Sequence, residues 1–195
     1  MNRKVLLVYA NPNPKAFNHS IFESLQKGLR TSGHEVKVKN LYAEAFNPVL
    51  DFKDYNALKE GSTPADILRE QECIDWADGL IFVYPLWWFD RPAILKGWID
   101  RVFAYGYAYG PKEDGSMSGL LKIKRAWAFQ TAGELESSFM KFGGRAAIET
   151  PMLDGTLKYC GIANSEMFSY FALGQKTGEE RNEILESIEK MASDF

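Results

Sequence analysis

A turn filled with large aromatic side chains is the feature that most constrains how this chain can fold. The segment before it, 79–83, is short and continuously apolar, which is typical of a central parallel strand covered on both faces. The segment after it, 92–103, begins with proline and repeats apolar residues at helical spacing. Between these segments lie four bulky residues, Leu86, Trp87, Trp88 and Phe89. A turn after a strand lies at the carboxyl edge of a sheet, where α/β proteins bind ligands, so we predict a flat apolar ligand here.

Length and composition indicate a single soluble domain over residues 1–195. A chain of 195 residues can bury roughly 70% of its unfolded surface, which is enough for one full core. The net charge is −3 and no basic run is present, so we expect neither nucleic acid nor an anionic membrane as a partner. No apolar run approaches the roughly 20 residues of a membrane helix. Cys73 and Cys160 are interpreted as reduced thiols, which suits the cytoplasm, and the spacing of His19 and His34 predicts no metal site.

Strand-like and helix-like segments alternate along the chain. We predict strands at 4–9, 35–39, 79–83, 125–130 and 165–171. We predict helices at 17–31, 64–76, 92–103, 150–160 and 179–191. Loose segments are expected at 41–61 and 104–121, the second rich in tyrosine and glycine. The alternation favours a doubly wound α/β domain with a flavodoxin-like five-stranded parallel sheet in the order 2-1-3-4-5. A Rossmann sheet is the alternative, but no Gly-x-Gly-x-x-Gly turn follows the first strand.

In this strand order the loops after the first, third and fourth strands meet at one edge. The first loop leads into a helix N-terminus that attracts phosphate, and Asn18 and Ser20 add side-chain donors. Taken alone, Asn18 is explained equally well as an ordinary helix cap, and the aromatic turn as a hydrophobic plug or dimer contact. The segment 131–134 has small residues that let backbone N–H groups approach a planar ligand. Together the three loops meet the demands of a flavin nucleotide.

The same residues resemble the NAD(P)H:quinone oxidoreductase family of flavodoxin-like flavoproteins. The matching segments are 4–10, 15–18, 40–42, 46–48, 70–71 and 85–98. The last of these, Pro-Leu-x-Trp-Phe-x-x-Pro-Ala-Ile-Leu-Lys-Gly-Trp, is highly specific. Weaker matches at Thr131, Gly133, 159–161 and the final helix extend the resemblance over nearly the whole chain.

The resemblance implies a homodimer with one flavin per subunit near the interface. NADH or NADPH would reduce the flavin first, and a quinone-like or other aromatic acceptor would reoxidise it from the same slot, in a ping-pong mechanism. Hydride would pass through flavin N5, so no side chain is expected to act as a nucleophile. FAD is favoured over FMN, because the segment 15–18 and Arg181 look more like the FAD-binding branch.

The family's contacts carry over to this chain position by position. Three residues would meet the phosphate and ribityl part of the flavin: Phe17, Asn18 and Ser20. The ring would lie against two loops, formed by Pro85, Leu86, Trp87, Trp88 and Phe89 and by Thr131, Ala132, Gly133 and Glu134. Arg181 matches an arginine near the adenosine of FAD. The acceptor would meet Trp88 and Phe89, together with Tyr107 and Tyr109 from the partner subunit.

The chain also departs from the family. Some members carry a tyrosine and a histidine after the loop at 131–133, whereas the segment 138–145 has neither. Lys141 or Arg145 is our candidate for the positive charge near the flavin N1/O2 edge, with a solvated surface position as the alternative. Two further functions stay open: a flavodoxin-type electron carrier, and a regulatory subunit of a membrane transporter, a partner that some family members bind.

Overall fold

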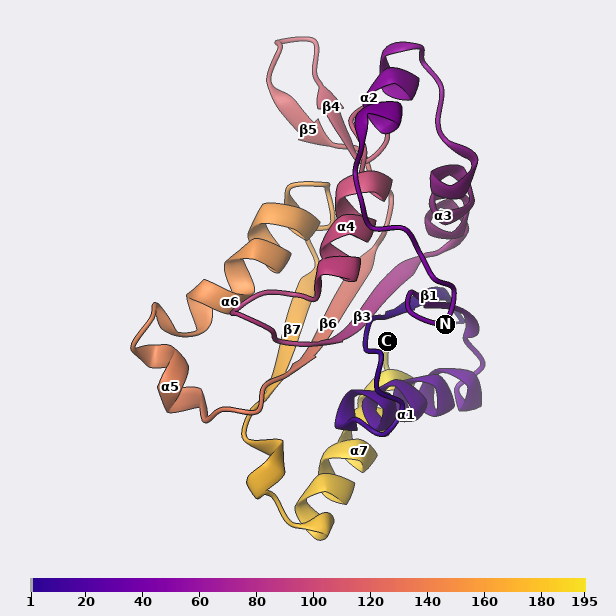
Figure 1. Cartoon of the computed structure of the whole chain (residues 1–195). Helices are drawn as coiled ribbons and strands as arrows, with labels where there is room; N and C mark the ends of the chain where they lie inside the picture. Colours follow the sequence, from indigo (N-terminus) through magenta and orange to yellow (C-terminus); the bar gives the residue numbers. More distant parts are fainter. Residues whose placement is uncertain (1) are drawn as a thin grey trace.

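Five parallel strands form the central sheet of the structure, a computed structural model that describes residues 2–195 (Figure 1). The strands are β1 (Lys4–Tyr9), β2 (Glu35–Asn40), β3 (Gly79–Pro85), β6 (Arg125–Thr131) and β7 (Ser165–Tyr170). Their order is β2-β1-β3-β6-β7, which confirms the predicted order 2-1-3-4-5. All residues of β3 are buried because this strand is central and helices cover both of its faces.

Helices form a layer on each side of the sheet (Figure 1). The helices are α1 (Phe17–Thr31), α2 (Phe52–Lys59), α3 (Ala65–Trp76), α4 (Ala93–Val102), α5 (Glu136–Met140), α6 (Gly144–Met152) and α7 (Gly178–Ser193). A π-helix (Leu153–Lys158) continues α6, and a short 3₁₀ helix (Leu173–Gln175) precedes α7. Helices α1 and α7 pack against each other on one face, and α3, α4 and α6 lie on the other.

Alternate residues of each strand enter two separate hydrophobic cores. Val5 and Leu7 of β1 face the core formed with α1 and α7, whereas Leu6 and Val8 face Trp98 of α4. All five side chains are fully buried. This two-residue alternation follows from the pleat of a strand and explains why the apolar pattern of β1 is unbroken.

The expectation that the segment 41–61 is loose was wrong in part, because it contains α2. Asp51 and Asp54 form a capping box: the Asp51 side chain accepts from the backbone N–H groups of Lys53 and Asp54, and the Asp54 side chain accepts from Asp51 N. The buried residue of α2 is Asp54, a charged group. The apolar side chains that α2 carries at helical spacing, Phe52, Tyr55 and Leu58, are all exposed, so no buried apolar face holds this helix.

Two other segments also differ from the prediction. The segment 104–121 contains an antiparallel hairpin of β4 (Tyr109–Pro111) and β5 (Met117–Gly119), whose strands are too short to show alternation. The helix predicted at 150–160 begins earlier, in α6, and continues as the π-helix. Pro151 lies inside α6 and lacks an N–H group, so regular α-helical bonding is interrupted where the π-helix begins.

A close contact between α4 and the segment before α2 requires glycine at position 97. An added Cβ would collide with the carbonyl oxygen of Pro48. We therefore expect G97A to lower the free energy of unfolding by about 2 kcal/mol, measured by urea denaturation, because overpacking forces the backbones apart. Gly178, the first residue of α7, faces open space and provides the control: G178A should leave stability unchanged or slightly raised. Equal stability of G97A and wild type would contradict this account.

Candidate functional site

Three loops meet at the carboxyl edge of the sheet, as the strand order predicts, and hydrogen bonds join them. The Thr131 hydroxyl, at the end of β6, donates to Asn18 Oδ1 at the start of α1 over 2.9 Å. The Leu86 N–H, directly after β3, donates to the carbonyl of Thr131 over 2.8 Å. Thr131 therefore connects the first loop and the aromatic turn to one strand end.

The start of α1 has unused hydrogen-bond donors. Its N-cap residue is Ala16, which supplies no side-chain cap, and no acidic residue lies in the first turn. Asn18 is 2% exposed; its Oδ1 accepts from Asn11, while its Nδ2 has no hydrogen-bond partner among residues 2–195. The alternative that Asn18 is an ordinary cap is therefore wrong. Uncapped N–H groups and a buried unpartnered amide are the donors that a phosphate needs. Phe17 and Ser20 are half-buried beside them.

The aromatic turn has a strained backbone. Hydrogen bonds between the backbones of Trp87 and Asp90 close a tight turn, with N···O distances of 2.9 and 3.1 Å. The two central residues, Trp88 and Phe89, have φ angles of 53° and 64°. This left-handed conformation costs a non-glycine residue about 1–3 kcal/mol. Trp88 is nevertheless 98% exposed, so its ring gains nothing from packing within the chain.

Phe89 points toward the next loop instead of away from the molecule. Its ring lies 4.7 Å from Phe139 of α5 and 5.8 Å from Phe142, measured between centroids. Phe142 and Met140 are exposed and extend the apolar surface beyond Trp88. Phe139 and Phe142 were not recognised as site residues in the sequence, although two aromatics three positions apart after a strand end were an available signal.

The loop after β6 leaves one backbone edge open. Ala132 is buried and its N–H bonds to Tyr170 O, whereas Gly133 and Glu134 are exposed. A Cβ added at Gly133 would meet no atom within 4 Å. Pro85 ends β3 next to this loop, paired with Thr131. A flavin nucleotide fits the features of this edge: the buried Asn18 amide, the uncapped start of α1, the open backbone at Gly133 and the exposed ring of Trp88. The contact of each residue with the flavin stays a prediction.

Strand β4, which begins with Tyr109, and the loop before it, which contains Tyr107, follow the end of α4 that is opposite to the aromatic turn (Figure 1). The ten residues of α4 separate the two ends by about 15 Å. Tyr107 donates its hydroxyl to Gln71 O and to Asp75, each over 3.0 Å, and burial raises its pKa. Within one chain these tyrosines therefore do not join the aromatic turn. Tyr109 instead pairs with Tyr159, whose ring is 5.6 Å away and which sequence reasoning missed.

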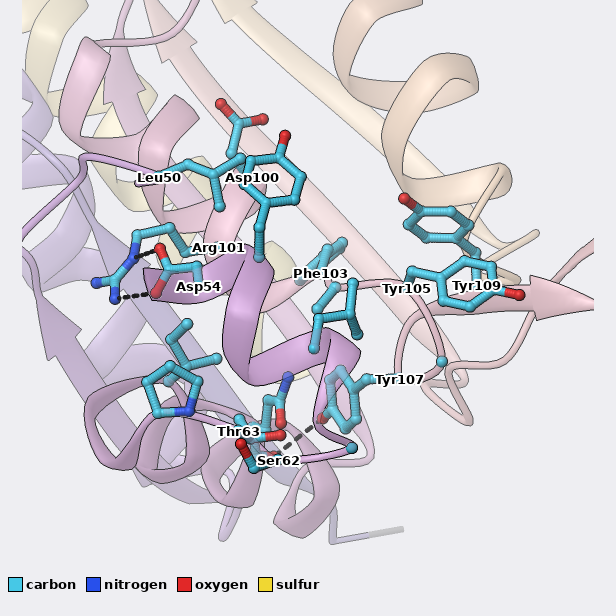
Figure 2. A pocket seen from close by; sticks show the side chains of 18 residues that line it. Leu50, Asp54, Ser62, Thr63, Asp100, Arg101, Phe103, Tyr105, Tyr107 and Tyr109 are labelled. Carbon is cyan, nitrogen blue, oxygen red and sulfur yellow. Dashed lines mark hydrogen bonds and ion pairs between the residues drawn. The ribbon is translucent and has the colours of Figure 1, made fainter. Parts of the chain in front are cut away.

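A cavity of about 440 Å³ lies at this end of α4, lined by α2, α3 and the tyrosine-rich loop (Figure 2). Arg101 bonds both carboxylate oxygens of Asp54, at 2.8 and 2.9 Å, and also Asp66 at 2.6 Å. The hydrogen bonds from Arg101 hold the pKa of the Asp54 carboxyl below its usual range. Because Asp54 is the buried residue of α2, this ion pair attaches α2 to α4.

Three basic residues named in the sequence have different surroundings. Arg181 donates from Nε and Nη2 to the carbonyl of Leu173, at 3.1 and 2.7 Å, and so ties α7 to the segment before it. Arg145 pairs with Glu136 and Glu149, which offset its charge, while Lys141 is exposed. Lys141 is therefore the better of the two candidates for a positive charge near the ring.

No helix within residues 2–195 is long and apolar enough to cross a membrane. Cys73 and Cys160 are both free thiols.

Comparison with known proteins agrees with this geometry. The family model described as flavodoxin-like fold matches residues 3–193. An uncharacterized NAD(P)H oxidoreductase of Haemophilus influenzae is 36% identical over 162 residues, which are 83% of this chain and 80% of the relative. NAD(P)H dehydrogenase [quinone] 1 of Cavia porcellus is 33% identical, with 96% and 75% covered. The structure of the NAD(P)H:quinone oxidoreductase from Methanothermobacter marburgensis superposes with a TM-score of 0.88 at 30% identity, covering 100% of this chain and 97% of that one. The chain belongs to the NAD(P)H:quinone oxidoreductase family of flavodoxin-like proteins.

The strain at Trp88 can be separated from the role of its ring. W88A removes the ring but keeps a Cβ at positive φ, whereas W88G removes both. We expect W88G to be more stable than W88A by about 1 kcal/mol in urea denaturation, because only glycine relieves the left-handed strain. Both variants should bind a flat aromatic ligand less tightly than wild type. W88A as stable as W88G would show that the turn is not strained.

Proposed function

We propose that this protein is a flavin-dependent NAD(P)H:quinone oxidoreductase that reduces quinone-like or other aromatic acceptors two electrons at a time by a ping-pong mechanism. The observation that carries the proposal is that the strained, exposed turn at Trp88 and the uncapped start of α1, with its unpartnered Asn18 amide, are both linked to Thr131 at the end of β6. The names of the relatives support the same reaction.

The first loop holds the charged end of the cofactor. The N–H groups at the start of α1 and the Asn18 amide bind its phosphate, and the helix dipole adds to the attraction. Asn11 and Thr131 both donate to Asn18 Oδ1, so the amide nitrogen is oriented away from them. Phe17 and Ser20 border the ribityl chain.

The aromatic turn and the loop after β6 hold the ring. A bound flavin would supply the redox chemistry, hydride transfer between NAD(P)H and the acceptor. Trp88 and Phe89 provide flat surfaces that orient donor and acceptor, and the open backbone at Gly133 supplies N–H groups to the polar edge. Lys141, an exposed residue after α5, adds positive charge near that edge. The nearby Phe139 and Phe142 exclude water.

The working unit is a homodimer. Tyr109 and Tyr159 lie about 15 Å from the aromatic turn of their own chain and reach a ring site only on a second copy. The exposed Trp88 also favours a partner surface. The cofactor is FAD, with FMN as the alternative; Arg181 lies toward the adenosine, and NADH or NADPH serves as donor. The two free thiols suit a cytoplasmic protein.

One experiment tests the proposed activity directly. The purified protein is incubated with excess FAD or FMN, the bound chromophore is released and identified, and NADH and NADPH oxidation is followed with a soluble quinone. We expect yellow protein, preferentially loaded with FAD, whose donor oxidation depends on the quinone. Protein that stays colourless with both flavins would end the proposal.

The phosphate contact has its own test in N18D. The new carboxylate can still accept from Asn11 and Thr131, but it places a negative charge where the phosphate is held. We expect affinity for FMN to fall about tenfold or more, because a charge-assisted hydrogen bond is replaced by repulsion. Affinity for riboflavin, which has no phosphate, should change little. N56D, which makes the same charge change on α2, is the control; equal losses for FMN and riboflavin in N18D would place the phosphate elsewhere.

A further inference from the structure

Arg91, directly after the aromatic turn, carries a buried guanidinium with unused donors. Its side chain is 5% exposed. Nη1 donates to the carbonyl of Pro151 over 3.2 Å and contacts the sulfur of Met152 at 3.4 Å. Nε has no hydrogen-bond partner among residues 2–195. The carboxylate of Asp90 forms an ion pair with Nε at 3.7 Å, but this contact is longer than a hydrogen bond and the carboxylate is itself 46% exposed.

This arrangement is unfavourable unless something else binds the guanidinium. A guanidinium has five N–H donors, and within the described residues Nη1 alone has hydrogen-bond acceptors. A buried charge without a matched partner costs free energy. Arg101, at the other end of α4, shows the contrast, because its guanidinium bonds two aspartates and a carbonyl.

Arg91 lines a groove between α4 and the π-helix. The groove has a volume of about 360 Å³, within the range of small-molecule sites. Ile99 and Phe103 contribute apolar surface, and Tyr109 and Tyr159 also line it. It therefore combines a cation, an apolar wall and aromatic rings.

The second cation of the groove is already neutralised. Lys96 bonds both carboxylate oxygens of Asp100, the farther one at 2.8 Å, and both residues are partly exposed. Arg91 is thus the groove cation without a carboxylate at hydrogen-bond distance within residues 2–195. The two cations carry the same charge but differ in burial and in pairing.

We propose that this groove binds an oxyanion, a carboxylate or a phosphate, carried by an aromatic substrate, and that the guanidinium of Arg91 holds it. A guanidinium binds carboxylate and phosphate oxygens through charge-assisted hydrogen bonds. The assignment to a substrate rests on the proposed function, in which Tyr109 and Tyr159 border the acceptor site of a second copy. Arg91 then makes the enzyme selective for acidic substrates, whether the anion is an acid group on the acceptor or a phosphate on the dinucleotide.

Binding is tested first without turnover, by calorimetry on the purified full chain with benzoate, benzamide and inorganic phosphate as probes. Wild type should bind benzoate or phosphate, and bind benzamide, the uncharged analogue of benzoate, more weakly. R91Q and R91K should each weaken anion binding roughly tenfold to a hundredfold, because loss of charge-assisted hydrogen bonds has that effect. R91K retains the buried charge and a donor for Pro151, so it serves where R91Q fails to fold. K27Q, which removes a surface cation on α1 outside the groove, is the control and should change the affinity less than twofold.

Three results would overturn the site: neither anion binds to wild type, R91K binds like wild type, or K27Q weakens binding as much as R91Q. Because these measurements need no catalysis, they stand even if the protein oxidises no NAD(P)H.

The source of the anion is identified by steady-state kinetics. The first arm measures the KM values of NADPH and NADH, with unsubstituted benzoquinone as the acceptor. The second arm measures the KM values of a carboxylated and an unsubstituted benzoquinone, with one donor at a fixed concentration. In one of the two arms, R91Q should raise the KM of the more negatively charged substrate roughly tenfold relative to the KM of its less charged counterpart. A shift in the first ratio assigns the dinucleotide phosphate, and a shift in the second assigns the acceptor acid. Unchanged ratios in both arms would refute a substrate role for Arg91.

Discussion

The site depends on one strand end, that of β6, and on the two hydrogen bonds that Thr131 makes there. Its hydroxyl reaches Asn18 and its carbonyl accepts from Leu86, so the start of α1 and the aromatic turn share one anchor. Parallel strands joined by right-handed crossovers bring their carboxyl ends to the same edge. The sheet therefore creates the edge, and Thr131 sets how the loops meet at it.

The aromatic turn shows how this anchored edge tolerates strain. Two adjacent residues with positive φ would be unfavourable in an isolated peptide, but the backbone bonds between Trp87 and Asp90 close the turn. Phe89 gains packing against Phe139 and Phe142, which offsets part of the cost. Trp88 gains none, so its exposed position is best understood through the ligand or subunit that it contacts. The conformation of Trp88 therefore lowers the stability of the folded chain, while it exposes the ring for binding.

The two buried arginines at the ends of α4 illustrate how pairing separates a structural role from a binding role. Arg101 bonds Asp54, Asp66 and a carbonyl, and it fastens α2, a helix whose large apolar side chains are exposed. Arg91 is equally buried, yet its Nε remains unpartnered. Burial alone does not distinguish these residues, whereas a count of their hydrogen bonds does.

The sequence by itself determined the strand order, α1, and the place of the three loops, because apolar periodicity and turn residues are local signals. It also contained the specific 85–98 block that indicates the family. Only the tertiary structure decided the left-handed turn at Trp88, the pairing of Tyr109 with Tyr159, and the contrast between Arg91 and Arg101. Each of these depends on contacts between distant residues: Arg101 and Asp54 are 47 positions apart, and no local pattern records such a partner. Helix α2 was missed for the same reason, since a buried ion pair rather than an apolar face holds it in place.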